Sequence, residues 1–386
     1  MKKRVCVLTA TRAEYGLLKP VIQKLRAYES LDVRVAATGA HLSPEFGLTY
    51  KEIERDGIPI DRRIEILLSS DTPSSISKSM GLALLGFADY FSEFQPDLLV
   101  VLGDRYETLA VCCAAMNQRI PIAHLYGGET TEGAVDEAYR HAITKLSYLH
   151  FTSTELYRKR VIQLGEDPSR VFYVGALGVG NILKEHLLSK QELEKSLGFP
   201  LGERYAVITY HPVTLETESS EVGFKALLEV LDAFPDLGIL FTKANADADG
   251  RIINELIDAY VSCHPHTNAF ASLGVKRYLS AVKHSDVVIG NSSSGIIEVP
   301  SLHVPTINIG DRQKGRQMAE SVINCKPNIK DIARALHYAL SKEGKNKAVA
   351  THNPYGAGDT AKLVCETIHQ YFLADSHTLK KAFYDL

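Results

Sequence analysis

Short runs of apolar and β-branched residues alternate with longer helical patterns along almost the whole chain, and this alternation limits the possible folds most strongly. The runs lack the strict apolar–polar alternation of half-exposed strands, so they predict strands that are buried on both faces. Strand–helix alternation on this scale predicts parallel sheets covered by helices and joined by right-handed crossovers. The predicted strands are 4–10, 32–38, 97–103, 120–126, 148–153, 171–175, 205–211, 238–243, 267–272, 286–292 and 304–310.

A change in composition near residue 180 divides the chain. The glycine cluster in VFYVGALGVGNILKEH (171–186) precedes the charged stretch SKQELEKSLGFPLGER (189–204). A length of 386 residues corresponds to two domains at roughly 150 residues each. We therefore predict an α/β protein with two Rossmann-like, doubly wound domains that face a cleft. The predicted divisions are 1–180, 181–365 and a C-terminal helix and tail, 366–386, that packs back on the first domain.

The composition indicates a globular protein and disfavours several kinds of partner. The chain is 45% hydrophobic and 23% charged, which is typical of a folded domain with a large core. A net charge of −3 argues against nucleic acid or an anionic membrane as the main partner. Six cysteines without a CxxC pair, and no apolar run near the ~18 residues of a membrane span, predict a cytoplasmic protein with reduced thiols and no metal site.

Polar residues of chemical interest gather just after the predicted strands. In open α/β sheets, ligands bind outside the carboxyl ends of the strands. If two such domains face each other, these positions converge on one cleft. They are Arg12, Glu14, Asp104, Arg105, Glu129, His211, Asn291 with the serines that follow it, and Arg312.

The motif VVIGNSSSGIIEVP (287–300) joins an apolar strand pattern to a short helix. Serine hydroxyls and the N–H groups of a helix N-terminus bind phosphate oxygens, and a glycine lets a ligand approach the backbone. A glutamate one turn later would accept hydrogen bonds from a ribose diol. We therefore predict a nucleotide phosphate site, with an N-cap cluster that binds nothing as the alternative. The residues of the predicted site are Ser292, Ser293, Ser294, Gly295 and Glu298.

Two arginines are candidates for the same diphosphate. Arg12 and Arg312 each follow a predicted strand, in different halves of the chain. A guanidinium presents a fork of donors that suits phosphate oxygens. The alternative for each is an ordinary surface arginine.

Three acids and a histidine are candidates for proton transfer, and each also has a structural interpretation. Asp104 could cap the helix that follows it. Glu129 lies in the turn-rich segment GGETTEG and could be a solvated loop charge. Asp136 begins a predicted helix and could complement its dipole. His211 precedes a proline, which holds it extended at a strand end, and it could be purely structural.

Five motifs together resemble the UDP-N-acetylglucosamine 2-epimerases. They are TATRAEYG (9–16), GDRYE (103–107), HLYGGETTEGAVDEAYRHAITKLSYLHF (124–151), HPVT (211–214) and GNSSSGIIEVP (290–300). The resemblance covers about residues 4–370 in the right order. It is strongest to the hydrolysing branch, which releases free N-acetylmannosamine and UDP for sialic acid synthesis.

The resemblance implies a glycosyltransferase-B-type fold, with UDP held mainly by the C-terminal half. It implies a UDP-sugar substrate, no cofactor, and a homodimer or homotetramer. The sequence departs from many relatives at Tyr126, where they have an acid, so the identity of the second acid or base stays open. The implied catalytic residues are Asp104, Glu129, Asp136 and His211. The implied UDP-binding residues are Arg12, Ser292, Ser293, Ser294, Gly295, Glu298 and Arg312.

The family reaction converts UDP-N-acetylglucosamine and water to N-acetylmannosamine and UDP, by elimination to a glycal and then hydration. The same reaction on UDP-2,4-diacetamido-2,4,6-trideoxyglucose fits the motifs as well, because C1 and C2 are equivalent there. A fold of this type also suits a UDP-sugar glycosyltransferase, a non-hydrolysing epimerase or a nucleotide-sugar sensor.

Overall fold

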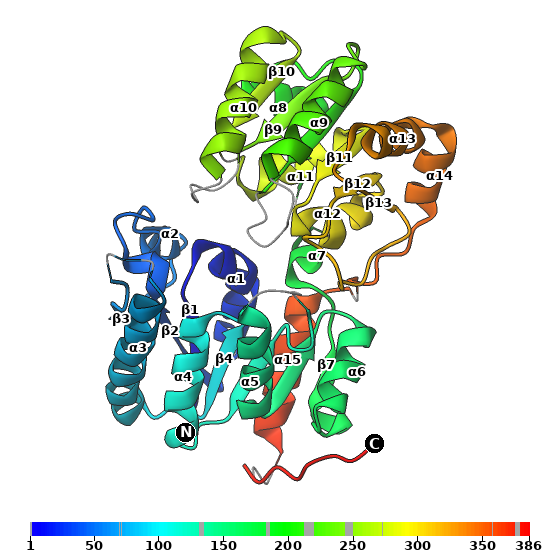
Figure 1. The fold of residues 1–386 in the computed structure, drawn as a ribbon. Coiled ribbons are helices and arrows are strands. Elements are labelled where there is room, and N and C mark those ends of the chain that lie inside the picture. Colours follow the sequence, from blue (N-terminus) through cyan, green and yellow to red (C-terminus); the bar gives the residue numbers. More distant parts are fainter. Residues whose placement is uncertain are drawn as a thin grey trace. The chain divides into compact units, whose positions relative to one another are not determined.

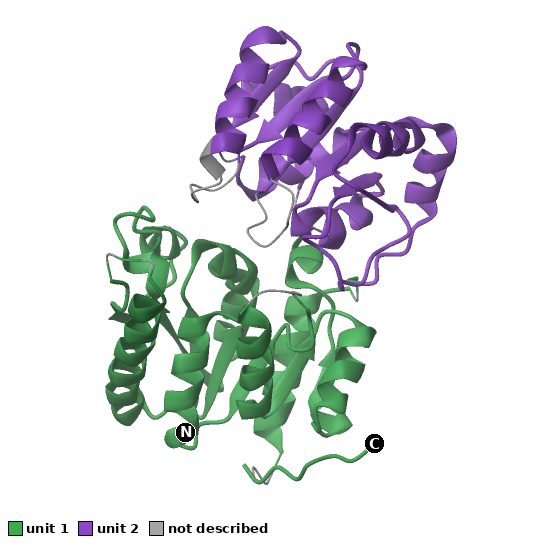
Figure 2. Ribbon diagram, viewed as in Figure 1, with its two compact units in different colours: residues 1–181, 355–386 green, residues 182–354 purple. Residues whose placement is uncertain are grey.

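The computed structural model describes residues 2–386 except 69, 71, 131–134, 183–185, 212–219, 244–249, 272, 357 and 375–378. The chain forms two compact units (Figure 2). The first contains residues 1–181 and 355–386, and the second contains residues 182–354. All six cysteines are free thiols. In the described part of the chain, no helix is both long enough and apolar enough to cross a membrane.

The first unit is a seven-stranded parallel sheet in the order β3-β2-β1-β4-β5-β6-β7, with helices on both faces (Figure 1). Its strands are β1 (Lys3–Thr9), β2 (Leu31–Thr38), β3 (Ile60–Ile64), β4 (Leu98–Leu102), β5 (Ile122–Leu125), β6 (Leu149–Thr152) and β7 (Val171–Tyr173). Its helices are α1 (Arg12–Arg26), η1 (Gly39–Leu42), α2 (Tyr50–Arg55), α3 (Pro73–Phe94), α4 (Tyr106–Asn117), α5 (Asp136–Leu146), α6 (Glu155–Gln163), η2 (Pro168–Arg170) and α15 (Thr360–Leu373). Helix α7 (Leu177–Ile182) leads into the second unit.

The second unit is a six-stranded parallel sheet in the order β10-β9-β8-β11-β12-β13. Its strands are β8 (Tyr205–Thr209), β9 (Gly238–Thr242), β10 (Thr267–Phe270), β11 (Val287–Gly290), β12 (Thr306–Ile309) and β13 (Val322–Cys325). Its helices are α8 (Lys190–Leu197), α9 (Ser220–Asp232), α10 (Gly250–Cys263), α11 (Gly274–His284), α12 (Ser293–Ile297), η3 (Val299–Leu302), α13 (Ile329–Leu340) and α14 (Lys342–Ala350). The strand order reverses between β1 and β4 in the first unit and between β8 and β11 in the second, which is where α/β sheets bind ligands.

Alternate residues of β1 belong to different cores, which shows why its sequence is a continuous apolar run. Val5 and Val7 pack in the core that includes α1 and α15. Cys6 and Leu8 pack in the opposite core with α3 and α4. Burial on both faces removes the apolar–polar alternation of a half-exposed strand. The predicted architecture of two doubly wound parallel sheets is confirmed.

Every strand predicted from the sequence is present, but the prediction missed β3 and β13. Both are edge strands of their sheets. β3 reads IDRRI, and only its last residue is buried; no residue of β13 is buried. An edge strand with little burial needs no apolar run, so the pattern that identified the inner strands is absent there.

Helix α15 packs on α1 within the first unit, although more than 330 residues separate them in the sequence. The ring of His369 stacks on Tyr28 at 4.5 Å between centroids. The Cys365 thiol donates to the carbonyl oxygen of Val21 at 3.5 Å. The end of the chain is therefore part of the first unit.

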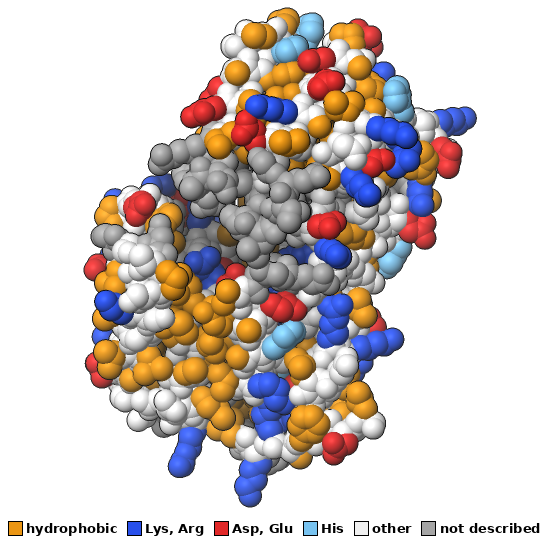
Figure 3. Space-filling model, in the orientation of Figure 1, with side chains coloured by type: hydrophobic (Ala, Val, Ile, Leu, Met, Phe, Trp, Pro, Cys, Tyr) orange, Lys and Arg blue, Asp and Glu red, His pale blue; other side chains and the backbone are white. Residues whose placement is uncertain are grey.

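An apolar surface covers α3 and α4 on the face drawn in Figure 3. The exposed large hydrophobic side chains of these two helices are Leu82, Leu84 and Leu85 of α3 and Met116 of α4. Apolar patches on a protein surface often mark interaction sites. The homodimer or homotetramer implied by the resemblance stays a prediction.

Candidate active site

The first unit gathers acids and arginines where β1 and β4 end and α5 begins. Their charges act on one another: the pKa of Asp136 is raised by burial and then by Asp104, while Arg105 and Arg140 lower it. We call this group the acid–arginine cluster. Its members are Glu14, Asp104, Arg105, Glu107, Asp136 and Arg140.

Asp104 is held by an ion pair and does not cap α4. Its carboxylate accepts from the guanidinium of Arg140, a buried residue one turn into α5. The N-cap position of α4 is Arg105, and no side chain caps that end. The structural interpretation of Asp104 as a cap is therefore wrong.

The acid–arginine cluster contains a second ion pair, between Glu107 and Arg105. Glu107, on the first turn of α4, is fully buried, and its Oε1 accepts from Arg105 Nε at 2.5 Å. Partial burial opposes the charge of Arg105, but Glu107 and then Glu14 raise its pKa. The positive charge of Arg105 is therefore kept beside the acids.

Glu14 is a buried acid with an unusually high pKa. Its Oε2 accepts from the backbone N–H of Ala10 at 2.8 Å, directly after β1. Burial raises the pKa of Glu14 from 4.5 to about 7, and the nearby charge of Glu107 adds to this. With a pKa of about 7, Glu14 gains and loses a proton near neutral pH, whereas Asp104 is ion-paired with Arg140.

Because the folded chain binds the Glu14 proton more tightly than the unfolded chain, the contribution of Glu14 to stability falls as pH rises from 4.5 to 7. The loss amounts to about 3 kcal/mol at most. Glu14→Gln should remove this pH-dependent loss of stability. The free energy of unfolding of the variant, relative to that of the parent, should therefore increase between pH 5 and pH 8. Urea unfolding at both pH values measures this, with the exposed Glu29→Gln as the control. Equal pH dependence in parent and Glu14→Gln would contradict the assignment.

Glu129 is buried, so its interpretation as a solvated loop charge is wrong. Its Oε1 accepts from the hydroxyl of Ser153, just after β6, at 2.6 Å.

Tyr126 has a left-handed backbone (φ 72°), and its hydroxyl accepts from the N–H of Leu177 at 2.8 Å. The phenol of Tyr126 is thus engaged at the start of α7.

Arg12 forms its ion pair with a residue outside the acid–arginine cluster. Its Nε pairs with Glu52 of α2 at 3.1 Å, and over half of its side chain is exposed. The pair is a surface ion pair of small energy. The proposed contact of Arg12 with a diphosphate stays a prediction.

In the second unit, Asn291 organises the ends of β8 and β11. Its side-chain amide makes two bonds to the backbone of His211: Oδ1 accepts from N–H at 2.7 Å and Nδ2 donates to the carbonyl at 2.8 Å. The preceding Gly290 has φ 138°, and a Cβ there would lie 1.9 Å from the carbonyl oxygen of Thr209. Glycine is therefore required where β11 turns away from β8.

The backbone of Asn291 also anchors the loop that follows β12. Its carbonyl accepts from Arg312 Nη1 at 3.0 Å and from Gln313 Nε2 at 2.9 Å. Asn291 itself is buried. It thus brings His211, Arg312 and the serine motif to one end of this sheet.

The serine motif caps a very short helix. Ser292 is the N-cap of α12, which has five residues, and its hydroxyl accepts from the N–H of Ser294 at 3.4 Å. So short a helix has a small dipole, so any phosphate binding depends on the hydroxyl and N–H groups of Ser292, Ser293 and Ser294 themselves. Glu298 ends the helix; burial raises its pKa, while Ser294 lowers it by hydrogen bonding.

Gly295 has a packing role that the sequence did not indicate. A Cβ there would lie 2.9 Å from Thr306 Cγ2 on β12. The Thr306 hydroxyl donates to the Gly295 carbonyl at 3.0 Å. Glycine at this position lets α12 lie against β12, and this packing role does not depend on a bound ligand.

Several site residues were not predicted. Glu107 and Arg140 lie within the five motifs, but nothing local distinguishes them from helix-surface charges. Glu137 accepts from the Thr130 hydroxyl at 2.8 Å and lies 3.7 Å from Arg140. Asn291 stands out in the sequence only as the residue before the serines. For Arg140 and Asn291, the signal that identifies them is a partner 36 and 80 residues away in the sequence.

Known proteins similar to this chain identify its family. A family model described as UDP-N-acetylglucosamine 2-epimerase matches residues 23–369. The chain is 45% identical over 345 residues to the Campylobacter jejuni GDP/UDP-N,N'-diacetylbacillosamine 2-epimerase (hydrolyzing), with 89% of each protein covered. It is 39% identical over 386 residues to the Escherichia coli polysialic acid biosynthesis protein P7, covering 100% of this chain and 98% of that one.

A solved structure shows the same fold. The UDP-GlcNAc 2-epimerase from Neisseria meningitidis, bound to UDP-GlcNAc, matches with a TM-score of 0.73 and 20% identity over 95% of this chain and 100% of the other. The predicted glycosyltransferase-B-type fold is thereby confirmed. With the family model matching most of its length, the chain belongs to the UDP-N-acetylglucosamine 2-epimerase family.

Proposed function

We propose that this chain is a hydrolysing 2-epimerase of a UDP-linked 2-acetamido sugar. A base removes the proton from C2, the C1–O bond breaks with its electrons leaving on UDP, and a C1–C2 double bond forms. Water then adds its oxygen to C1, and a proton returns to C2 from the opposite face. The products are UDP and the free sugar inverted at C2.

The observation that carries this proposal is the coexistence of two kinds of acid in the acid–arginine cluster. Asp104, paired with Arg140, suits the role of a base. Glu14 and Asp136 have raised pKa values and suit the role of a proton donor. Acids whose environments separate their pKa values supply the base and the acid of such a reaction.

The second unit supplies candidates for the leaving group. Charge grows on the diphosphate as the C1–O bond breaks, and fixed donors lower the energy of that transition state. Ser292, Ser293, Arg312 and His211 are proposed for this role because Asn291 ties their loops together. Glu298 is proposed as the acceptor for the ribose hydroxyls.

The proposed sugar is 2,4-diacetamido-2,4,6-trideoxyglucose, which is N,N'-diacetylbacillosamine. Its support is the name of the C. jejuni relative, which has the higher identity of the two relatives described. UDP-N-acetylglucosamine is the second candidate, and the relative named for polysialic acid biosynthesis favours it. The family reaction at C1 and C2 is the same for both.

Incubation with each UDP-sugar in D2O, without an acceptor, tests the proposal. Proton NMR should show UDP, a free sugar inverted at C2, and deuterium at C2. The rate with the diacetamido sugar should exceed that with UDP-N-acetylglucosamine by at least about tenfold, as expected of a site that binds the second amide. Products that remain joined to UDP, or no turnover until an acceptor is added, would contradict the hydrolysing reaction.

A further inference from the structure

The segment 379–386 lies against the end of α5 that is opposite to the acid–arginine cluster. Lys381 Nζ donates to the backbone carbonyls of Ser147 and Lys145 at 2.6 and 2.9 Å. These carbonyls belong to the last turn and the C-cap of α5. A lysine at this end of a helix satisfies carbonyls that have no partner within the helix.

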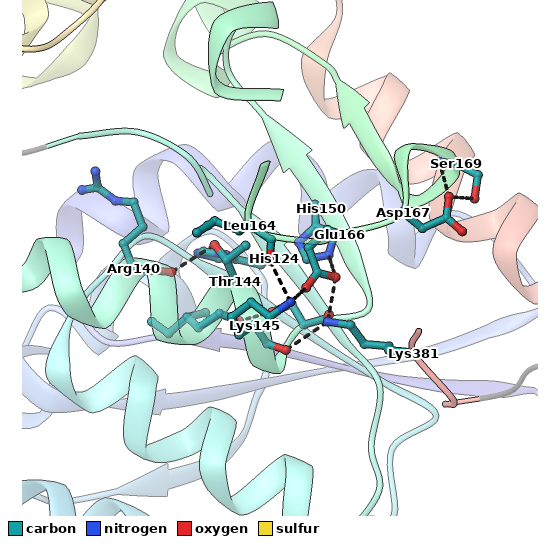
Figure 4. Close-up of polar contacts among 12 residues, drawn as sticks. His124, Arg140, Thr144, Lys145, His150, Leu164, Glu166, Asp167, Ser169 and Lys381 are labelled. Carbon is teal, nitrogen blue, oxygen red and sulfur yellow. Dashed lines mark hydrogen bonds and ion pairs between the residues drawn. The ribbon is translucent and has the colours of Figure 1, made fainter. Parts of the chain in front are cut away.

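The third hydrogen bond of Lys381 reaches a buried acid. Its Nζ lies 2.7 Å from Glu166 Oε2, and Glu166 is fully buried (Figure 4). The same carboxylate accepts from Lys145 Nζ at 2.6 Å and from His150 Nε2 at 3.0 Å. An ammonium has three donors, so the three oxygens use the full donor capacity of Lys381.

Backbone and ring contacts hold the same segment in place. The N–H of Tyr384 donates to the carbonyl of Gly165 at 3.0 Å. Gly165 has φ 85°, and a Cβ there would lie 2.3 Å from the ring of Phe383. Lys145 Nζ lies 5.3 Å from the centre of that ring. The segment is therefore fitted to this surface by shape as well as by charge.

The other end of α5 carries the proposed chemistry. Asp136 is its first residue, and Arg140 pairs with Asp104. In the last turn of α5, the Thr144 hydroxyl lies 3.3 Å from His124 Nδ1 (Figure 4). His124 Nε2 donates to the carbonyl of Gly103, the residue before Asp104, at 2.8 Å. A shift of α5 along its axis would therefore move Asp136 and Arg140 relative to Asp104.

We infer that Lys381 is a positioning residue for catalysis: it caps α5 from the C-terminal segment and fixes the helix so that Arg140 and Asp136 meet Asp104. The inference rests on the proposed function for its kinetic test. Misplacement of a catalytic group by about 1 Å costs up to about a hundredfold in rate, so a loosened cap should affect turnover more than binding.

Lys381→Met in the full chain should lower kcat about tenfold, with KM for the UDP-sugar and the Kd for UDP within about twofold of the parent. Backbone amides of α5 should exchange hydrogen faster. Lys381→Arg, which keeps the charge and the donors, should recover most of the lost kcat.

Two matched controls separate capping from charge. Lys145→Met removes a lysine from the same carboxylate but leaves the α5 carbonyls bound to Lys381, so its kcat should stay within about twofold. Lys78→Met removes an exposed lysine of α3, and its kcat should also stay within about twofold of the parent.

Parental kcat and parental α5 exchange in Lys381→Met would overturn the inference, and so would an equal loss of kcat in Lys145→Met. If Lys381→Met proves too unstable to assay, an Arg variant that folds but does not recover kcat would also overturn it. Hydrogen exchange reports on the cap even if the parent turns over no UDP-sugar, so failure of the proposed function is distinguishable.

Discussion

Asp104→Asn should lower kcat for UDP release by about a thousandfold and leave the Kd for UDP within about twofold. The amide has nearly the same shape as the carboxylate, but it cannot accept the C2 proton. UDP affinity should persist because all the residues predicted to bind the nucleotide, except Arg12, belong to the second unit. Stopped incubations with quantified UDP measure the first effect, and calorimetry measures the second.

The structure suggests one side effect and a control for it. Arg140 is buried and loses one of its charged partners in Asp104→Asn, keeping Glu137 at 3.7 Å, and breaking a buried ion pair costs stability. The melting temperature therefore has to be measured alongside kcat. Asp89→Asn, an exposed aspartate on α3, should change neither value. Full turnover by folded Asp104→Asn would transfer the role of the base to another member of the acid–arginine cluster.

The sequence was sufficient to predict the inner strands. It was also sufficient to predict that the site residues follow the carboxyl ends of the strands. Burial on both faces forces continuous apolar runs, and a parallel sheet brings the carboxyl ends of those strands together. That reasoning placed Asp104 after β4 and His211 after β8. It failed for β3 and β13, because a strand at the sheet edge with little burial leaves no such run.

The contacts that give the site its chemistry were not predictable in the same way. Glu14 looks like an ordinary acid in the first turn of a helix, yet it is buried against Ala10 and affected by Glu107. The partner of Asp104 lies 36 residues away, and the partner of His211 lies 80 residues away. The spacing of residues within one motif carries no information on pairs between distant motifs. A single sequence offers no other information on which residues pair.

Lys381 is the extreme case of this limit. It follows a helix and a stretch of polar residues and reads as a surface lysine. Only the fold brings it to carbonyls 234 and 236 residues earlier in the chain.

Asn291→Asp should weaken UDP binding by about a hundredfold, which corresponds to about 2.7 kcal/mol. The substitution preserves size, and the carboxylate still accepts from the His211 N–H. It removes the donor to the His211 carbonyl and places a negative charge facing that oxygen. A buried acceptor without its donor costs about 1–3 kcal/mol. The new charge would also repel a diphosphate held by the adjoining serines, so the two effects add.

Isothermal titration with UDP, with circular dichroism to verify folding, measures this loss. The control is Asn328→Asp in the same unit, because Asn328 is the exposed N-cap of α13. Aspartate keeps the oxygen that accepts from the Asp331 N–H, although it loses the Nδ2 donor to the Asp331 carboxylate. Because Asn291 is buried, salt should screen its new charge only weakly, so the loss of UDP affinity should change little with ionic strength. Parental UDP affinity in a folded Asn291→Asp would mean that the diphosphate does not lie beside Asn291, and the serine motif would then be a helix cap alone.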